Sequence, residues 1–218
     1  MITDSDRAFA IEHAAARDGF HVKRNDSSHL ISTRISTVES HRRGILGECA
    51  FVNRFGGAVD VELRPSGDER DFSIVVFVKG VATRFDVDVK ANSYTGPTRY
   101  LLVPVDYIKP QTIYVDAQYL EARDDIELMG WAFGKALIKR DQRKALNSRQ
   151  VLNFVMPIAE LRPIAELLAR VEIARIIEPL PQSIIARLLI DLPQAPPLVP
   201  SPRAAIQTQF EFINGGAP

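Results

Sequence analysis

The spacing of apolar residues divides the first half of the chain into helices followed by strands. A short helix is expected near Asp4–Arg17, within a polar segment that extends to about residue 35. A longer helix is predicted over Thr37–Phe55, because its apolar side chains recur at helical spacing and Gly56-Gly57 follows as a stop signal. The chain is therefore expected to enter its sheet after residue 57.

Strands are predicted where apolar and polar residues alternate, or where an apolar run is unbroken. Val59–Leu63 and Phe85–Lys90 alternate strictly, which is typical of strands with one buried face. Asp71–Val81 contains the apolar run FSIVVFV, which favours a strand buried on both faces. Further segments with strand character are Tyr100–Val105, Ile113–Leu120 and the start of Ile126–Ile138, whose end is predicted to be a short helix.

The last third of the chain has helical and proline-rich patterns. Leu161–Ile177 has helical spacing with Pro163 in its first turn, and Ser183–Ile190 is a second short helical pattern. Seven of the fourteen prolines fall between Pro179 and Pro202, which predicts an extended segment. We therefore expect an N-terminal helical extension (1–35), an α/β core (36–140) and a C-terminal helical and Pro-rich appendage (141–218).

Composition places the chain among ordinary globular proteins. Of 218 residues, 46% are hydrophobic and 25% are charged, which excludes a disordered chain. Lys and Arg number 27 and Asp and Glu number 27, so the formal net charge is zero. This balance argues against binding nucleic acid through bulk positive charge, but it is compatible with a local basic patch.

Cysteine content and the N-terminal segment bear on the compartment. The single cysteine, Cys49, excludes an internal disulfide and a Cys-rich zinc site, and it fits a reducing environment. The first residues, MITDSDRAFA, lack the positive charge and apolar core of a signal peptide. No apolar stretch is long enough to span a bilayer. These features predict a cytoplasmic protein with no membrane partner.

The first candidate for chemistry is a carboxylate on the apolar face of the predicted helix Thr37–Phe55. Glu48 lies near the centre of the stripe that includes Ile45, Phe51 and Phe55. A charge in such a position is costly unless it is paired or bound to a metal. Two interpretations are open: Glu48 meets a core arginine or caps a turn, or it belongs to a metal site.

Two strands supply further candidates. Asp88 and Lys90 share one face of their strand about 7 Å apart, close enough to contact one phosphate. Asp71 opens the apolar strand after a turn, and a hairpin would bring it to the same end of the sheet as Asp88. Ordinary roles are also open, namely a solvated strand face and a turn aspartate. Other acidic candidates are Asp60, Glu62, Asp68 and Asp86.

Taken in order, these features resemble the PD-(D/E)XK nuclease superfamily. The matching segments are GILGECAFVNRFG (Gly44–Gly56), PSGDERDFSIVV (Pro65–Val76) and FDVDVKAN (Phe85–Asn92). IELMGWAFGKALI (Ile126–Ile138) is similar to an apolar Gly-Trp-helix ending of small phage and bacterial members. The resemblance covers about half of the chain. It implies a restriction-endonuclease-like fold, in which a mixed β-sheet is flanked by helices.

The resemblance also implies a reaction and a cofactor. Asp71, Asp88 and the main-chain carbonyl of Val89 would bind Mg²⁺ or Mn²⁺, with Glu48 joining directly or through water. Lys90 would orient the attacking water and neutralise charge on the scissile phosphate. The expected protein is a metal-dependent endo- or exonuclease, with DNA favoured over RNA on family grounds. The alternative is an inactive module of the same fold that binds nucleic acid or a protein partner.

A basic segment after the predicted core is the candidate for substrate binding. Its cations, which suit phosphate contacts, are Lys135, Lys139, Arg140, Arg143 and Lys144. A solvated basic helix face is the equally open alternative. Gln118 is either an accessory polar residue near the site or an ordinary strand residue. The C-terminal helices are a candidate surface for a homo-oligomer.

Overall fold

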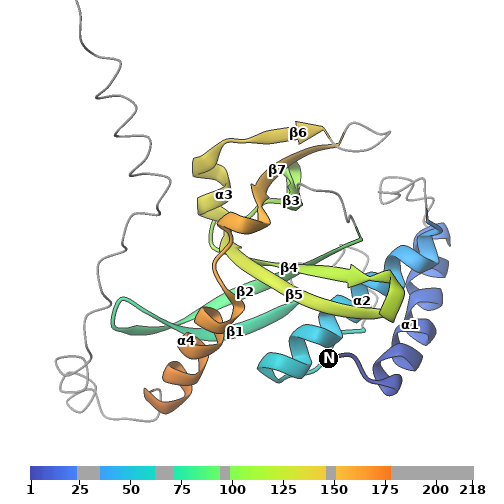
Figure 1. Cartoon of the computed structure of the whole chain (residues 1–218), viewed down its shortest axis with the longest axis horizontal. Helices are drawn as coiled ribbons and strands as arrows, with labels where there is room; N and C mark the ends of the chain where they lie inside the picture. Colours follow the sequence, from blue (N-terminus) through green and yellow to red (C-terminus); the bar gives the residue numbers. More distant parts are fainter. Residues whose placement is uncertain (24–34, 62–70, 94–98, 146–150, 178–218) are drawn as a thin grey trace, which may run out of the picture. The chain divides into compact units, whose positions relative to one another are not determined.

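A computed structural model describes residues 1–23, 35–61, 71–93, 99–145 and 151–177, all within one compact unit, Met1–Pro179. In these residues the chain is mixed α/β, with four α-helices and two β-sheets (Figure 1). The predicted helix Ser183–Ile190, the Pro-rich segment after it and the turn at 65–68 lie outside the described residues. None of the helices in the described ranges has the length and apolar character that crossing a membrane requires.

The larger sheet is mixed, as the sequence predicts. Its strands, in spatial order, are β1 (Phe72–Val78), β2 (Val81–Asn92), β4 (Ile113–Leu120) and β5 (Asp125–Phe133). The β2–β4 pair is parallel, and the two outer pairs are antiparallel. The β1–β2 hairpin turns at Lys79 and Gly80, where φ is 49° and 85°; positive φ at both positions matches the right-handed twist of the strands.

Two helices, α2 (Thr37–Phe55) and α4 (Ile164–Ile177), cover one face of this sheet, and α1 (Asp4–Lys23) packs on α2. Alternation along β2 and β4 turns Val89 and Ala117 toward this helical layer, where they join the main core. Gly47 allows α2 to approach closely, because a Cβ there would lie 3.3 Å from the Cβ of Ala91 and 3.4 Å from that of Ala117. Close contact at Gly47 brings the next residue, Glu48, to the sheet.

The opposite face of the larger sheet carries a second, smaller core. It is covered by α3 (Gly134–Arg140) and by a three-stranded antiparallel sheet with the order β3 (Tyr100–Pro104), β7 (Leu152–Pro157) and β6 (Arg143–Ala145). Tyr114 of β4 and Leu137 of α3 are buried in this second core. The even-numbered side chains of β2 and β4 therefore face the three-stranded sheet, and the odd-numbered ones face the helices.

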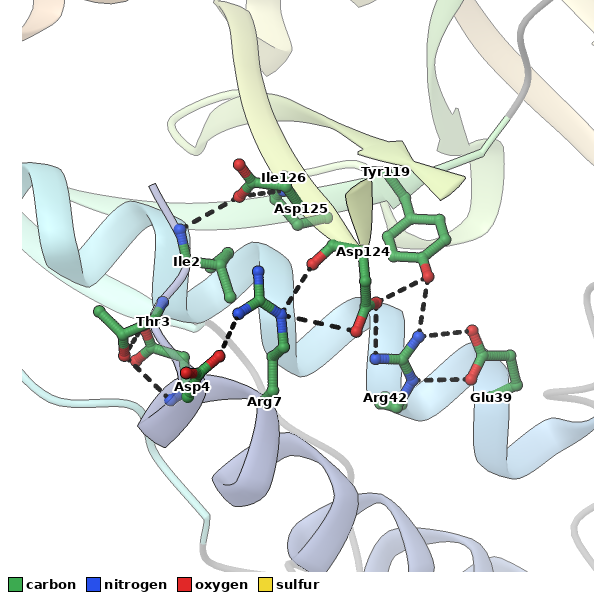
Figure 2. Close-up of polar contacts among 11 residues, drawn as sticks. Ile2, Thr3, Asp4, Arg7, Glu39, Arg42, Tyr119, Asp124, Asp125 and Ile126 are labelled. Atoms are coloured by element: carbon green, nitrogen blue, oxygen red, sulfur yellow. Dashed lines mark hydrogen bonds and ion pairs between the residues drawn. The ribbon is translucent and has the colours of Figure 1, made fainter. Parts of the chain in front are cut away.

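A network of ion pairs ties α1 and α2 to the turn between β4 and β5 (Figure 2). Arg42 donates to both carboxylate oxygens of Glu39, to the Asp124 carboxylate at 2.9 Å and to the Tyr119 hydroxyl at 2.9 Å. Arg7 of α1 donates to the main-chain carbonyl of Asp124 at 3.1 Å. The network joins elements that are far apart in sequence and holds α1 beside the sheet.

The structure corrects two expectations. Val59–Leu63 was expected to be a strand, but residues 59–61 are irregular, and the remainder lies outside the described residues. The carbonyl of Asp60 instead accepts a hydrogen bond from Arg17 of α1. Beyond residue 140 a basic stretch, two helices and a Pro-rich segment were expected, yet strands β6 and β7 form there. The apolar run in β7 is short and buried on both faces, and periodicity does not distinguish such a strand from a buried helix segment.

Gly134→Ala tests the close packing at the start of α3. A Cβ at this position would lie 2.1 Å from the main-chain oxygen of Lys109, which belongs to the backbone and has little freedom to move. We expect a loss of at least about 2 kcal/mol in the free energy of unfolding, measured with urea. Gly44→Ala on α2 is the control: nothing lies within 4 Å of its Cβ, so alanine should stabilise by up to about 1 kcal/mol. Equal effects of the two changes would contradict this packing.

Candidate active site

Three of the predicted site residues lie together where β1 begins beside β2, and the charge of a fourth acts on one of them. Asp88 and Lys90 form an ion pair on β2, with 2.7 Å between Oδ2 and Nζ. Asp71 lies directly before β1, close enough to both for their charges to act on its carboxyl group. Glu48 of α2 also acts on Asp71 electrostatically. Asp71, Asp88 and Lys90 therefore form one cluster of charges, and the charge of Glu48 reaches Asp71 from α2.

Main-chain hydrogen bonds fix Asp71 against β2. Its N–H donates to the carbonyl of Val87 at 3.0 Å, and its Oδ2 accepts from the N–H of Val89 at 2.6 Å. Residues two apart on a strand direct their peptide groups to the same side, so Val89, like Val87, has its carbonyl on the β1 side. The last β1–β2 pair joins Phe72 to Val87. The Val89 carbonyl thus lies past the end of that ladder, beside the Asp71 carboxylate.

The pKa values of Asp71 and Lys90 are both raised by their surroundings in the cluster. Burial, together with the charges of Asp88 and Glu48, raises the pKa of Asp71 well above its usual range, although the Val89 hydrogen bond and Lys90 oppose the shift. Burial disfavours the charged form of Lys90, but the charge and hydrogen bond of Asp88 outweigh it and raise the pKa of the lysine. The lysine is therefore held as an ammonium ion among carboxylates.

Glu48 is buried with 7% of its surface exposed, and it is paired with an arginine from α1. Arg17 donates to both carboxylate oxygens, at 2.9 Å and 3.2 Å, and also to the Asp60 carbonyl at 3.1 Å. Pairing with a core arginine was one of the two interpretations that the sequence left open for Glu48. The structure shows this pairing and also places Glu48 within electrostatic reach of Asp71.

The donor set suits a hard divalent cation that retains water ligands. Among the described residues, no three His, Cys, Asp or Glu side chains are grouped as a ready-made metal cage. Mg²⁺, however, usually binds through one or two carboxylates and several waters, so Asp71, Asp88 and the Val89 carbonyl are a sufficient protein contribution. A cation would also offset the burial and the neighbouring negative charges that raise the pKa of Asp71. The residues present fit such an ion.

Gln118 of β4 lies on the same sheet face as Lys90. It is two residues beyond Asp116, the residue of β4 that pairs with Lys90. It is fully buried, its Oε1 accepts from Arg99 at 3.4 Å, and its Nε2 donates to the carbonyls of Asn92 and Tyr119. These contacts link β2 and β4 at the end of their parallel pairing. They place Gln118 in a polar group with Asn92, Arg99 and Asp116, further along the sheet than Asp88.

The predicted basic residues are divided between two elements. Lys135, Lys139 and Arg140 lie on α3, and Arg143 and Lys144 lie on β6. Arg140 is paired with Glu160 through both carboxylate oxygens, and Arg143 with Asp141 at 2.6 Å. Lys144 donates to the Tyr100 hydroxyl at 2.7 Å and lies 4.0 Å from the centre of that ring. Lys135 and Lys139 are exposed.

Two polar residues near the cluster were missed by sequence reasoning. Arg17 was placed on a helix, but nothing in the pattern indicated that it would meet Glu48, 31 residues away. Asp116 is completely buried on β4, and one of its oxygens accepts from Asn92 at 2.7 Å. The alternation of Tyr114, Asp116 and Gln118 along one face was the available signal for Asp116.

Comparison with known proteins adds no relative. No protein-family model, no curated protein and no solved structure matches this chain. The features that bear on function are therefore the residues of the site and the sequence motifs.

Arg17→Met tests the buried ion pair. The change removes the guanidinium that pairs with Glu48. Only 9% of the Glu48 side chain is exposed, so its negative charge would remain buried without that partner. We expect about 3 kcal/mol of destabilisation in urea unfolding. Adding Glu48→Gln should restore most of that loss, because the buried negative charge is then absent. A double variant as unstable as Arg17→Met alone would contradict the pairing.

Asp116→Asn tests the buried carboxyl of β4. Burial raises the pKa of Asp116 from 3.8 to about 7, although the Asn92 hydrogen bond and Arg99 oppose the shift. The folded protein therefore retains a proton that the unfolded chain loses, and stability falls as pH rises from about 4 to about 7, by up to about 4 kcal/mol. Asp116→Asn should remove this fall, so its advantage over the wild type in urea unfolding should grow between pH 4.5 and pH 8. A difference between the two proteins that does not change with pH would contradict the assignment.

Proposed function

We propose that this protein is a metal-dependent nuclease that hydrolyses phosphodiester bonds, with a restriction-endonuclease-like core. One observation carries the proposal: the Asp71 carboxylate is bonded to the N–H of Val89, beside the Asp88–Lys90 ion pair. The groups needed to hold a cation and a phosphate are two aspartates, a lysine and the Val89 carbonyl, which lies beyond the last β1–β2 pair. Their order along the chain agrees with the resemblance to PD-(D/E)XK nucleases.

The proposed chemistry assigns a separate task to each group. Asp71 and Asp88 bind the cation with the Val89 carbonyl, and a divalent cation supplies a more acidic bound water and stabilises negative charge on phosphate oxygens. Lys90, held as an ammonium ion, contacts the scissile phosphate and orients the attacking water. Glu48 adds negative charge to the cluster, and Arg17 balances part of it.

The proposed substrate is nucleic acid, with DNA favoured over RNA because of the resemblance. Exposed Lys135 and Lys139 on α3 are suited to phosphate contacts. Lys144 joins them from β6, where it is associated with Tyr100. Arg140 and Arg143 have carboxylate partners, so they contribute less net positive charge. Phosphate binding is accordingly assigned first to the three lysines.

A second candidate function is an inactive module that binds nucleic acid or a protein partner. The observation that favours it is the two-point contact between Arg17 and Glu48, which engages one predicted metal ligand within the protein. Metal binding separates the two candidates. Calorimetry with Mn²⁺ should detect a site in the nuclease that Asp71→Ala removes, whereas the module would bind nucleic acid equally well with a chelator present.

Asp88→Asn and Lys90→Met test the nuclease directly. Each removes one charge of the ion pair with little change in side-chain size, and we expect at least a hundredfold loss of Mg²⁺- or Mn²⁺-dependent cleavage. The matched control is Asp86→Asn, which changes a carboxylate on the same strand and face, two residues before Asp88. Cleavage of single- and double-stranded DNA and RNA should be measured with and without metal.

The pattern across the three variants decides the assignment. Asp86→Asn should retain wild-type cleavage, and circular dichroism should show all three variants folded. Full cleavage by both Asp88→Asn and Lys90→Met would reject the nuclease. Loss in Asp86→Asn with full activity in Asp88→Asn would show that the wrong carboxylate had been assigned.

A further inference from the structure

Asp116 has a buried oxygen whose hydrogen-bonding capacity is unused. The residue has 0% of its surface exposed, and its Oδ1 accepts from the Asn92 amide at 2.7 Å. Its Oδ2 is the one buried side-chain oxygen or nitrogen of the described residues that has no hydrogen-bond partner. Leaving such an atom unpaired costs about 1–3 kcal/mol, so a group that takes it as a partner in another state would explain its retention.

The strand register makes a lysine the direct neighbour of Asp116, while in the present arrangement the cation whose charge acts on Asp116 is Arg99. In the parallel β2–β4 pair, Lys90 is the direct partner of Asp116, so both side chains point to the same face from strands about 4.8 Å apart. On the other side, the partner of Asp116 on β5 is Gly130, which has no side chain. A lysine carries its ammonium on a flexible four-carbon stem, long enough to reach across to the neighbouring strand.

Lys90 already has another partner on its own strand. Its Nζ lies 2.7 Å from Oδ2 of Asp88, one of the two carboxylates proposed to bind the cation. A divalent cation bound to Asp88 would draw on that carboxylate and repel the ammonium. Lys90 would then need a new counter-charge within reach, or it would turn toward solvent and away from the phosphate.

We propose that Asp116 is a positioning residue for Lys90. When a cation occupies Asp71 and Asp88, the free carboxylate oxygen of Asp116 accepts a hydrogen bond from the Lys90 ammonium. This inference rests on the proposed function, because it assigns the second partner of the lysine in the cation-bound site. Asp116 does not touch the phosphate or the cation; it keeps Lys90 over the sheet, beside the bond to be broken.

A metal-free structural experiment tests the pairing. Asp88→Asn removes the charge of the present partner, as a bound cation would, while keeping the shape of the side chain. Crystal structures of Asp88→Asn and of Asp88→Asn with Asp116→Asn should be compared in the absence of divalent ions at about pH 8, above the pKa of about 7 of Asp116. We expect the Lys90 ammonium to lie within hydrogen-bonding distance of Asp116 in the first and to leave that position in the second. Retention of the lysine at residue 88 in the first structure would overturn the inference.

Kinetics provide a second, independent measurement. With Mg²⁺, Asp116→Asn should lower kcat by roughly tenfold to a hundredfold with little change in KM, since the change displaces a catalytic group and leaves binding intact. In a Lys90→Met background the same change should cause no further loss of the residual rate. A purely structural role would lower the rate in both backgrounds, and this result would overturn the inference.

The two proposals fail in different ways. If Lys90 moves to Asp116 in Asp88→Asn but the wild type neither binds Mn²⁺ nor cleaves, the nuclease is rejected and the pairing is supported. If the wild type cleaves with Mg²⁺ and Asp116→Asn cleaves at the same rate, the nuclease stands and the role of Asp116 is rejected.

Discussion

The parallel pairing of β2 with β4 is the contact on which the candidate site depends. It aligns Lys90 with Asp116 and Asn92 with Gln118, and alternation gives all four side chains the same face. Parallel strands are normally apolar on both faces because both faces are covered. Here the face toward the helices follows that rule, and the other face carries polar and charged groups beneath the three-stranded sheet.

Burying these groups opposes folding, and the surrounding structure offsets the cost locally. Arg17 pairs with Glu48, Lys90 pairs with Asp88, and the main-chain N–H of Val89 donates to the Asp71 carboxylate. These partners reach the site from α1, β2 and the end of the β1–β2 hairpin. Burial and the charges of Asp88 and Glu48 nevertheless raise the pKa of Asp71, a kind of shift that is also found at catalytic sites.

Local patterns in the sequence account for much of the fold. Helix α2 was predicted with its observed ends, because Gly56 and the spacing of apolar residues are local signals. The strand Ile113–Leu120 and the Asp88–Lys90 face followed from composition and alternation. The mixed α/β class and mixed sheet are confirmed by the structure.

Features that depend on distant partners were not predictable in the same way. The ion pair of Arg17 with Glu48 needs the packing of α1 on α2, and the pairing of β3 with β7 spans some fifty residues. The burial of Asp116 depends on the three-stranded sheet, which includes two strands that the pattern did not reveal. Convergence of Asp71 with Asp88 was inferred from a hairpin, so only a short-range assumption was needed there.

The position of Arg17 gives the N-terminal helix a role at the site that the sequence did not indicate. By sequence, α1 looked like an addition to a core that starts at residue 36, and none of the predicted ligands belongs to it. In the structure its guanidinium balances one of those ligands. A chain shortened to begin at residue 36 would keep every acidic group of the site and lose the positive charge that moderates them. The first helix is thus an electrostatic part of the site, and the smallest chain that preserves the site's charge balance must include it.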